Sequence, residues 1–200
     1  MSDAPRRRHA LESFLDRRRD IADAQRGLQV RVRPALDYTN LRGKLEDVAF
    51  VTAVESLLQQ SLPICSNTLT TGPQTIYWLG PDEWLIVTEA NAGIYDRLSV
   101  ALESHVSGVT PQNGGLIQMT LSGEFARDVL AKGCTLDLHT RAFQVGQCAQ
   151  TGLAKADVLL ALTDNMPSFN LIVRRSFAEY IALWLAHSGS EFGVEFSQQS

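Results

Sequence analysis

The stretch YWLGPDEWLIV, residues 77–87, places apolar and aromatic side chains on both sides of a Gly-Pro-Asp-Glu turn. The residues on either side of the turn are rich in β-forming types, which predicts a β-hairpin. The expected register pairs Leu79 with Trp84, Trp78 with Leu85 and Tyr77 with Ile86. Because successive pairs point to opposite faces, both faces of this hairpin are apolar. The fold must therefore cover both faces, either with helices of this chain or with another chain.

Upstream of the hairpin, the sequence predicts one strand and one amphipathic helix. LQVRVRPAL, residues 28–36, alternates apolar and polar residues as an edge strand does, and Pro34 limits its ladder of hydrogen bonds. Asp47 is placed to cap a helix that runs to about Gln60. The apolar positions that recur at helical spacing in it are Val48, Val51, Val54, Leu57 and Leu58.

Downstream of the hairpin, a helix is expected from about Ala92 to Val106, followed by the loop VTPQNGG and the strand LIQMTL. Ser122 is expected to cap the next helix, EFARDVLAK, and Gly133 to end it. A second hairpin is predicted within QTGLAKADVLLALTD, followed by the strand FNLIV. Ser176 is expected to begin a last helix, SFAEYIALWLAH, which Gly189 stops.

The order of these elements nearly repeats. A strand, a helix, a hairpin and a helix are followed by a strand, a helix, a hairpin, a strand and a helix. This order predicts an α+β fold of two related halves, with antiparallel sheets covered by helices. The expected parts are a basic N-terminal arm over residues 1–26, a domain over 27–189 with halves of about 27–107 and 114–189, and a C-terminal tail over 190–200.

Charge is distributed unevenly along the 200 residues. The net charge is -4, but residues 1–19 carry six arginines against three acidic residues. The acidic balance gives no reason to expect a nucleic acid or an anionic membrane as partner, so the arm is interpreted as a solvated or partner-bound extension. Within it, Leu11, Phe14 and Leu15 lie on one side of a predicted short helix that needs a surface to lie on.

The 44% of hydrophobic residues provides ample material for a core, but no apolar run reaches the length of a membrane-spanning helix. The arginines near the N-terminus are not followed by the hydrophobic stretch of a signal peptide. A cytoplasmic protein is therefore expected. Three cysteines at irregular spacing indicate reduced thiols and not a disulfide framework.

Few residues form the patterns that catalysis or metal binding requires. Cys134, His139 and Cys148 resemble part of a zinc site, but structural zinc takes four ligands with paired short spacings, so core thiols and a hydrogen-bonded histidine are expected instead. Cys134 with His139 is the pair to test for a thiol enzyme, although no motif surrounds them. Asp82 and Glu83 diverge from a turn, which Asp82 is expected to stabilise. No catalytic, cofactor or metal site is predicted in this chain.

Three blocks of the chain resemble a known family. They are YWLGPDEWLIV (77–87), LSGEFARDVLAKGCTLDLHTRAFQVGQCAQTGLAKADVLL (121–160) and NLIVRRSFAEYIALWL (170–185). In the middle block, the succession Leu-Ala-Lys-Gly-Cys, Leu-Asp-Leu-His and Cys-Ala-Gln-Thr is quite specific. Over about residues 28–187 the chain is similar to the gamma subunit of heterotetrameric sarcosine oxidase.

The resemblance implies a small subunit of a bacterial flavoenzyme that oxidatively demethylates sarcosine, giving glycine, a one-carbon unit for tetrahydrofolate and hydrogen peroxide. It also implies a fold similar to the folate-binding domain of the glycine-cleavage aminomethyltransferase. It places no cofactor in this chain. FAD, FMN and NAD are expected in the alpha and beta subunits, zinc in the delta subunit and tetrahydrofolate in a domain of alpha, and alpha is the partner expected in direct contact.

Two departures leave alternatives open. The arm lies outside the resemblance, and Val109–Asn113 lacks the acidic residue of an aminomethyltransferase-like pattern. One alternative is a subunit of a related N-methyl amine oxidase or dehydrogenase. The other is a folate-binding module, with a pocket between the halves and Arg174 or Arg175 meeting the glutamate tail. For a scaffold subunit, the interface residues predicted here are Trp78, Trp84, Arg174, Arg175 and Trp184.

Overall fold

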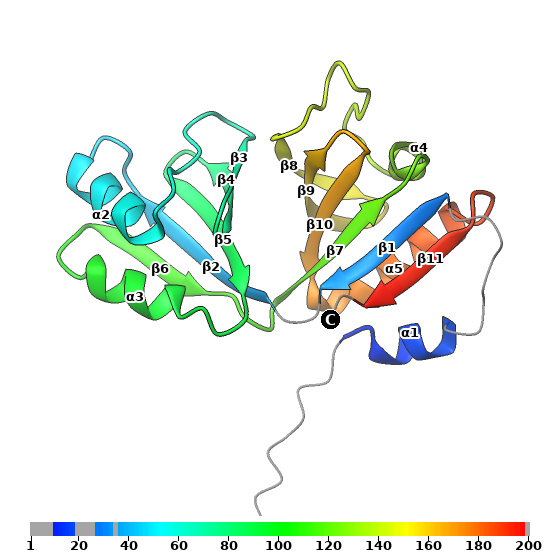
Figure 1. Ribbon diagram of the computed structural model, residues 1–200, viewed down its shortest axis with the longest axis horizontal. Coiled ribbons are helices and arrows are strands. Elements are labelled where there is room, and N and C mark those ends of the chain that lie inside the picture. The colour runs from blue at the N-terminus through cyan, green and yellow to red at the C-terminus, as the bar shows by residue number, and fades with distance from the viewer. Residues whose placement is uncertain (1–9, 19–26, 34–35, 199–200) are drawn as a thin grey trace, which may run out of the picture.

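The computed structural model describes residues 10–18, 27–33 and 36–198 (Figure 1). The helices are α1 (Glu12–Arg18), α2 (Val48–Leu58), α3 (Ile94–Ala101), α4 (Ala126–Ala131), the 3₁₀ helix η1 (Arg175–Phe177) and α5 (Ala178–Ser188). The first sheet contains, in spatial order, β3 (Leu69–Thr71), β4 (Thr75–Gly80), β5 (Glu83–Glu89), β2 (Leu36–Gly43) and β6 (Ser107–Pro111). The second sheet contains β11 (Val194–Gln198), β1 (Leu28–Arg33), β7 (Leu116–Ser122), β10 (Ser168–Arg174), β9 (Ala156–Asp164) and β8 (Cys148–Leu153).

The two sheets face each other between layers of helices. Helices α2 and α3 cover the outer face of the first sheet, and α4 and α5 pack on the outer face of the second (Figure 1). Paired strands of the described residues run antiparallel, except that β1 and β11 are parallel. This arrangement confirms the predicted α+β fold with antiparallel sheets covered by helices.

The two halves repeat one order of elements. In the first half this order is β2, α2, β3, β4, β5, α3 and β6, and in the second half it is β7, α4, β8, β9, β10, α5 and β11. Four strands also take matching places, since β3, β4, β5 and β2 are neighbours in one sheet and β8, β9, β10 and β7 in the other. The predicted relation between the halves is therefore present in both order and pairing.

The strands that lie beside β2 and β7 correct the expected division of the chain into halves. Beside β2 lies β6, which forms in residues that include part of the predicted loop VTPQNGG. Beside β7 lies β1, which was expected at the edge of the first half and instead lies inside the second sheet, between β7 and β11. Leu28, Val30 and Val32 alternate along β1, so they share one face of the strand. All three are fully buried, because this face packs into the core of the second sheet.

Strand β11 and helix α1, which lie near the two ends of the described residues, both belong to the part of the fold built on the second sheet. Strand β11 forms within the segment expected to be a tail, and it pairs with β1 from Leu28 opposite Val194 onward. Helix α1 confirms the short helix expected in the arm, since Leu11, Phe14 and Leu15 are buried in the same core. The surface on which α1 lies therefore belongs to this chain.

The hairpin of β4 and β5 forms as predicted but in a different register. The observed partners are Ile76 with Ile86, Tyr77 with Leu85, Trp78 with Trp84 and Gly80 with Glu83. The expected pairs are wrong by one position because the ladder is interrupted between Trp78 and Gly80, which leaves Leu79 in a bulge.

Helix α2 begins where the sequence predicts. Asp47 accepts hydrogen bonds from the backbone amides of Ala49 and Phe50, at 3.1 Å each, which confirms its capping role. The buried side differs from the expected one, however, because Phe50 lies in the core whereas Val48 is 74% exposed. Phe50 occupies space beside Gly43, where a Cβ atom would lie 2.3 Å from the phenyl ring.

Other helix boundaries differ in part from the prediction. Ser122 does not cap α4, since β7 continues through Ser122, and Ser176 lies within η1 ahead of α5. Helix α3 ends before the expected Val106, which is 89% exposed. Gly133 follows the C-cap of α4 and Gly189 is the C-cap of α5, as predicted. None of the described helices has both the length and the apolar character of a transmembrane segment.

Apolar contacts between the sheets form an inter-sheet cluster. It contains Tyr38, Leu69, Tyr77, Leu85 and Val87 from the first sheet and Cys148, Leu159, Ala161 and Ile172 from the second. On the opposite side of the hairpin, Ile76, Trp84 and Ile86 pack under α2 and α3. Both apolar faces of the hairpin are thus covered within this chain, one by helices and the other by the second sheet.

Candidate functional site

The two tryptophans of the hairpin occupy different environments. Trp84 is fully buried, and its indole Nε1 donates a hydrogen bond to the Pro63 carbonyl at 2.9 Å. The prediction that Trp84 meets a partner is therefore wrong, because an indole whose N–H finds an internal acceptor is stable in the core. Trp78 is only partly buried, and its place at an interface stays a prediction.

Buried tyrosine hydroxyls lie between the sheets. The Tyr77 hydroxyl accepts a hydrogen bond from Asn170 Nδ2 at 3.1 Å, and Thr120 donates to Asn170 Oδ1 at 3.0 Å. Burial raises the pKa values of Tyr77 and Tyr38 well above the ordinary tyrosine value, because the charged phenolate would lose its hydration. Neither phenol is poised for proton transfer near neutral pH, so both contribute to packing between the sheets.

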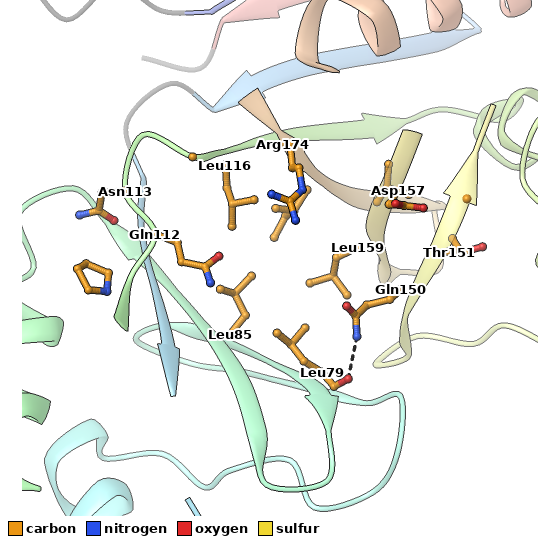
Figure 2. A pocket seen from close by; sticks show the side chains of 15 residues that line it. Leu79, Leu85, Gln112, Asn113, Leu116, Gln150, Thr151, Asp157, Leu159 and Arg174 are labelled. Atoms are coloured by element: carbon orange, nitrogen blue, oxygen red, sulfur yellow. Dashed lines mark hydrogen bonds between the residues drawn. The ribbon is translucent and has the colours of Figure 1, made fainter. Parts of the chain in front are cut away.

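A cleft of about 910 Å³ opens beside the inter-sheet cluster (Figure 2). Its apolar walls come from both sheets and consist of Leu79, Leu85, Pro111, Leu116, Val158, Leu159 and Ile172. The polar side chains at its surface are Gln112, Asn113, Gln150, Thr151, Asp157 and Arg174. A cleft of this size between two halves, with apolar walls and few polar groups, is typical of small-molecule sites.

Two of the polar side chains in the cleft are available to a ligand. Arg174, the last residue of β10, and Gln112 both point toward the open space (Figure 2). In the part of the chain that the structure describes, no hydrogen bond or ion pair occupies the Arg174 guanidinium or the side-chain amide of Gln112, whereas the Gln112 backbone amide donates to the Tyr38 carbonyl at 2.8 Å. By contrast, Gln150 Nε2 donates to the Leu79 carbonyl at 2.7 Å and ties the sheets together. A guanidinium beside leucines suits a carboxylate on an apolar body.

The loop that enters the cleft from β6 contributes no carboxylate. Asn113 is turned away (Figure 2), where its Oδ1 accepts from the Tyr38 amide at 2.7 Å and its Nδ2 donates to Asp37 at 2.8 Å. The carboxylate among the residues that line the cleft is Asp157 of β9.

No local sequence pattern singles out Gln112, Gln150 or Asp157 as cleft residues. The available signal is alternation in the second hairpin, where Gln150 shares a face with the buried Cys148. These three side chains come together because the two sheets stack on each other, and no local sequence pattern predicts that stacking.

Arg174 and Arg175 lie together at the exposed end of β10. Arg174 also lines a hollow of about 520 Å³ next to the cleft, together with Ala10, Gly115, Arg175 and Ser176. Trp184 is partly buried on α5, where it packs over Gly133. The predicted interface residues Arg174, Arg175 and Trp184 thus retain exposed surface, and their contact with a partner stays a prediction.

The cysteines and His139 have separate surroundings. The buried Cys148 thiol donates to the Thr68 carbonyl at 3.2 Å, and desolvation raises its pKa to about 12. Cys134 Sγ lies 3.8 Å from Thr151 Oγ1, and His139 is exposed in a loop, where its Nδ1 accepts from a backbone amide. Across residues 10–18, 27–33 and 36–198, no three His, Cys, Asp or Glu side chains gather as metal ligands.

The adjacent carboxylates of the first hairpin bind residues of β2 and of the loop that follows it. Asp82 takes the left-handed conformation, with φ of 61°, and its Oδ1 accepts from the Leu45 amide at 3.0 Å. Glu83 accepts hydrogen bonds from Asn40 at 2.9 Å and from Arg42 at 2.8 Å. Asp82 therefore lies in the turn, as predicted, but its side chain binds the segment after β2 and not the turn itself. The two carboxylates bind different partners.

Comparison with known proteins gives consistent matches. Residues 42–191 match the model of the family described as "Sarcosine oxidase, gamma subunit family". The chain is 38% identical to sarcosine oxidase subunit gamma of Corynebacterium sp. (strain U-96) over 60% of this chain and 58% of that protein. It is 34% identical to the subunit of the same name in Corynebacterium sp. (strain P-1), over 74% of this chain and 71% of that protein. The first alignment thus spans less than two thirds of the relative's length.

Solved structures agree with these matches. A chain of the heterotetrameric sarcosine oxidase from Corynebacterium sp. U-96, in complex with pyrrole 2-carboxylate, superposes with a TM-score of 0.85 at 28% identity, covering 93% of this chain and 96% of that one. Aminomethyltransferase T of the glycine cleavage system from Bartonella henselae gives a TM-score of 0.62 at 16% identity, covering 86% and 48%, which shows a common fold. The chain belongs to the sarcosine oxidase gamma subunit family.

Proposed function

We propose that this chain is the gamma subunit of a heterotetrameric sarcosine oxidase and supports its assembly without an active site of its own. The observation that carries the proposal is the superposition on 96% of a chain from such a complex, with a TM-score of 0.85. Within the described residues, the thiol of Cys148 and the carboxylates of Asp82 and Glu83 form hydrogen bonds that hold the fold together, which fits a scaffold role.

The partner subunits carry the chemistry in this proposal. Sarcosine is oxidatively demethylated to glycine, the one-carbon unit passes to tetrahydrofolate, and oxygen is reduced to hydrogen peroxide. FAD, FMN, NAD, zinc and tetrahydrofolate are assigned to the alpha, beta and delta subunits, with alpha in direct contact with this chain. We place the complex in the cytoplasm. A complex that oxidises another N-methyl amine would use the same scaffold. The rates at which the purified complex oxidises sarcosine and other N-methyl amines distinguish these two alternatives.

Co-expression tests the scaffold role. A tagged form of this chain is expected to co-purify with the alpha, beta and delta subunits as a yellow complex that forms peroxide from sarcosine. The chain purified alone is expected to be colourless, and omission of the chain is expected to lower the yield of assembled complex. A chain that stays monomeric beside all three subunits would contradict the proposal.

A second candidate function is binding of a reduced folate in the cleft. The observation that favours it is the cleft of about 910 Å³, whose leucine walls and Arg174 suit an aromatic ring system that ends in a carboxylate. Against it, Asn113 of the loop from β6 is turned toward Asp37 and places no carboxylate in the cleft.

Calorimetry with 5-formyltetrahydrofolate on the isolated chain decides this second candidate. Binding in the micromolar range, weakened about tenfold or more in Arg174→Gln, is the expected result, because the charged hydrogen bonds to the carboxylate are lost. Arg175→Gln is the matched control, since Arg175 does not line the cleft. Absence of heat at millimolar folate would remove this candidate and leave the scaffold role intact.

A further inference from the structure

The cleft between the sheets carries one positive and one negative side chain. Among the residues that line it, the charged ones are Arg174 of β10 and Asp157 of β9. Along the strands, Asp157 alternates with Leu159 and Arg174 with Ile172, so both charges lie on the face that the second sheet turns toward the first. The lining is therefore neutral as a whole but offers both signs of charge.

The two charges are neighbours that do not pair. Strands β9 and β10 are antiparallel with Val158 opposite Val173, and the same register continued by one position places Asp157 opposite Arg174. Opposite charges in such cross-strand positions lie close enough to interact. Within the described residues, however, neither side chain forms an ion pair or a hydrogen bond, and the guanidinium points into the open space (Figure 2). Both charges are therefore available to one ligand.

The rest of the cleft adds an amide and apolar walls. The side-chain amide of Gln112, which follows β6, enters from the first sheet and points toward the same open space (Figure 2). Leu79 and Leu85 of the first sheet and Leu159 of the second supply the walls. Gln150 holds these walls together, since its Nε2 donates to the Leu79 carbonyl at 2.7 Å. Such preformed apolar walls with a few polar groups are typical of small-molecule sites.

We propose that this cleft binds an amino acid zwitterion with an apolar side chain. The ligand carboxylate binds the Arg174 guanidinium, which matches it with two parallel hydrogen bonds, and the Gln112 amide. The ligand ammonium donates to Asp157, and the ligand side chain lies against the leucines. The two charged groups of an amino acid lie on one carbon atom, which suits a guanidinium and a carboxylate on neighbouring strands. This site adds a ligand to the scaffold role and does not depend on that role.

The charge balance separates this ligand from a reduced folate. The glutamate tail of a folate has two carboxylates, so it uses the guanidinium but also brings negative charge near Asp157, which opposes binding. A zwitterion satisfies both charges. Sarcosine and glycine belong to the same chemical class, but their small bodies leave the leucine walls uncovered, so they are expected to bind more weakly.

Calorimetry on the full-length chain with L-leucine tests the site. Two analogues each lack one charge, since isocaproate has no ammonium and L-leucinamide has no carboxylate. Each is expected to bind about tenfold or more weakly than L-leucine, because one charged contact is lost. Sarcosine is expected to bind more weakly by about the same factor, because it buries less apolar surface.

Matched variants assign each charge of the ligand to its partner. Asp157→Asn is expected to lose the preference for L-leucine over isocaproate and to keep the preference over L-leucinamide. Arg174→Gln is expected to do the reverse. Asp128→Asn and Arg141→Gln are controls that leave both preferences unchanged, because these exposed residues do not line the cleft. Circular dichroism and the unfolding midpoint of each variant establish that the chain stays folded.

Four outcomes would overturn the proposal. The first is the absence of binding at about 10 mM L-leucine. The second is equal affinity for L-leucine and isocaproate. The third is an unfolding free energy that falls equally in Asp157→Asn, Arg174→Gln and the double variant, which would show that the two side chains pair with each other. The fourth is binding of 5-formyltetrahydrofolate, strengthened by Asp157→Asn, in a chain that does not bind L-leucine. None of them bears on the scaffold role, which co-expression tests separately.

Discussion

At the residue scale, Gly133 marks a place where a missing side chain decides the packing. A Cβ atom there would lie 2.4 Å from Trp184 Cζ2, between the end of α4 and the outer helix α5. Gly133→Ala is therefore expected to lower the free energy of unfolding by about 1–3 kcal/mol, since the indole must leave its site. Urea unfolding measures this, with Gly80→Ala as control because no atom lies within 4 Å of a Cβ at Gly80. Equal losses in both variants would contradict the explanation.

The Cys148 thiol makes stability depend on pH. Burial raises its pKa from the ordinary 9.0 to about 12, so above pH 9 the unfolded chain loses this proton while the folded chain keeps it. The contribution of the protonated thiol to the free energy of unfolding is fully present below pH 9. As the pH rises from 9 toward 12, this free energy falls by about 1.4 kcal/mol per pH unit.

Cys148→Ala is expected to remove this part of the alkaline decline. Urea unfolding of wild type and variant, below and above pH 9, gives the slopes. Cys65→Ala supplies the control, because the Cys65 thiol is exposed. Identical alkaline slopes for wild type and Cys148→Ala would show that another group is responsible.

At the element scale, α2 depends on its first turn. The Asp47 carboxylate satisfies two backbone amides that the helix leaves without acceptors, those of Ala49 and Phe50. Asp47→Ala is expected to cost about 1 kcal/mol of unfolding free energy, whereas Asp47→Asn keeps most of the capping. Chemical denaturation followed by circular dichroism measures the difference. If both variants lose the same amount, the carboxylate acts through its charge and not through the cap.

At the scale of the whole molecule, the two sheets form one unit. The inter-sheet cluster is apolar, and backbone hydrogen bonds join the two sheets at one edge. The Cys148 amide of β8 donates to Asn67 in the loop before β3 at 2.8 Å, and the Leu69 amide of β3 donates to Gly146 in the loop before β8 at 3.0 Å. The arrangement also interlocks the halves, because β1 precedes the first sheet in the chain and pairs within the second.

A single cooperative unfolding transition is therefore expected. Trp84 reports on the first sheet and Trp184 on the second, so variants that retain one of these tryptophans follow the two halves separately by fluorescence. Coincident midpoints are expected for both reporters and for circular dichroism. Midpoints that differ would show that the halves unfold independently.

The sequence by itself determined the features that neighbouring residues create. The cap of α2, the ends of α4 and α5, the two hairpins and the repeat of elements follow from periodicity and from local hydrogen bonding. Strand β2 was not predicted, because Asp37, Asn40 and Arg42 interrupt its apolar pattern.

Only the tertiary structure decided the pairing of β1, the bulge at Leu79, the burial of Trp84 and the convergence of Gln112 and Arg174 on the cleft. Each of these depends on contacts between residues far apart in the chain. A local sequence pattern shows that one side of a helix or strand is apolar. Which other segment buries that side depends on how segments far apart in the sequence pack together. For the same reason the hairpin's aromatic face became core, whereas Leu183 of α5 remained exposed.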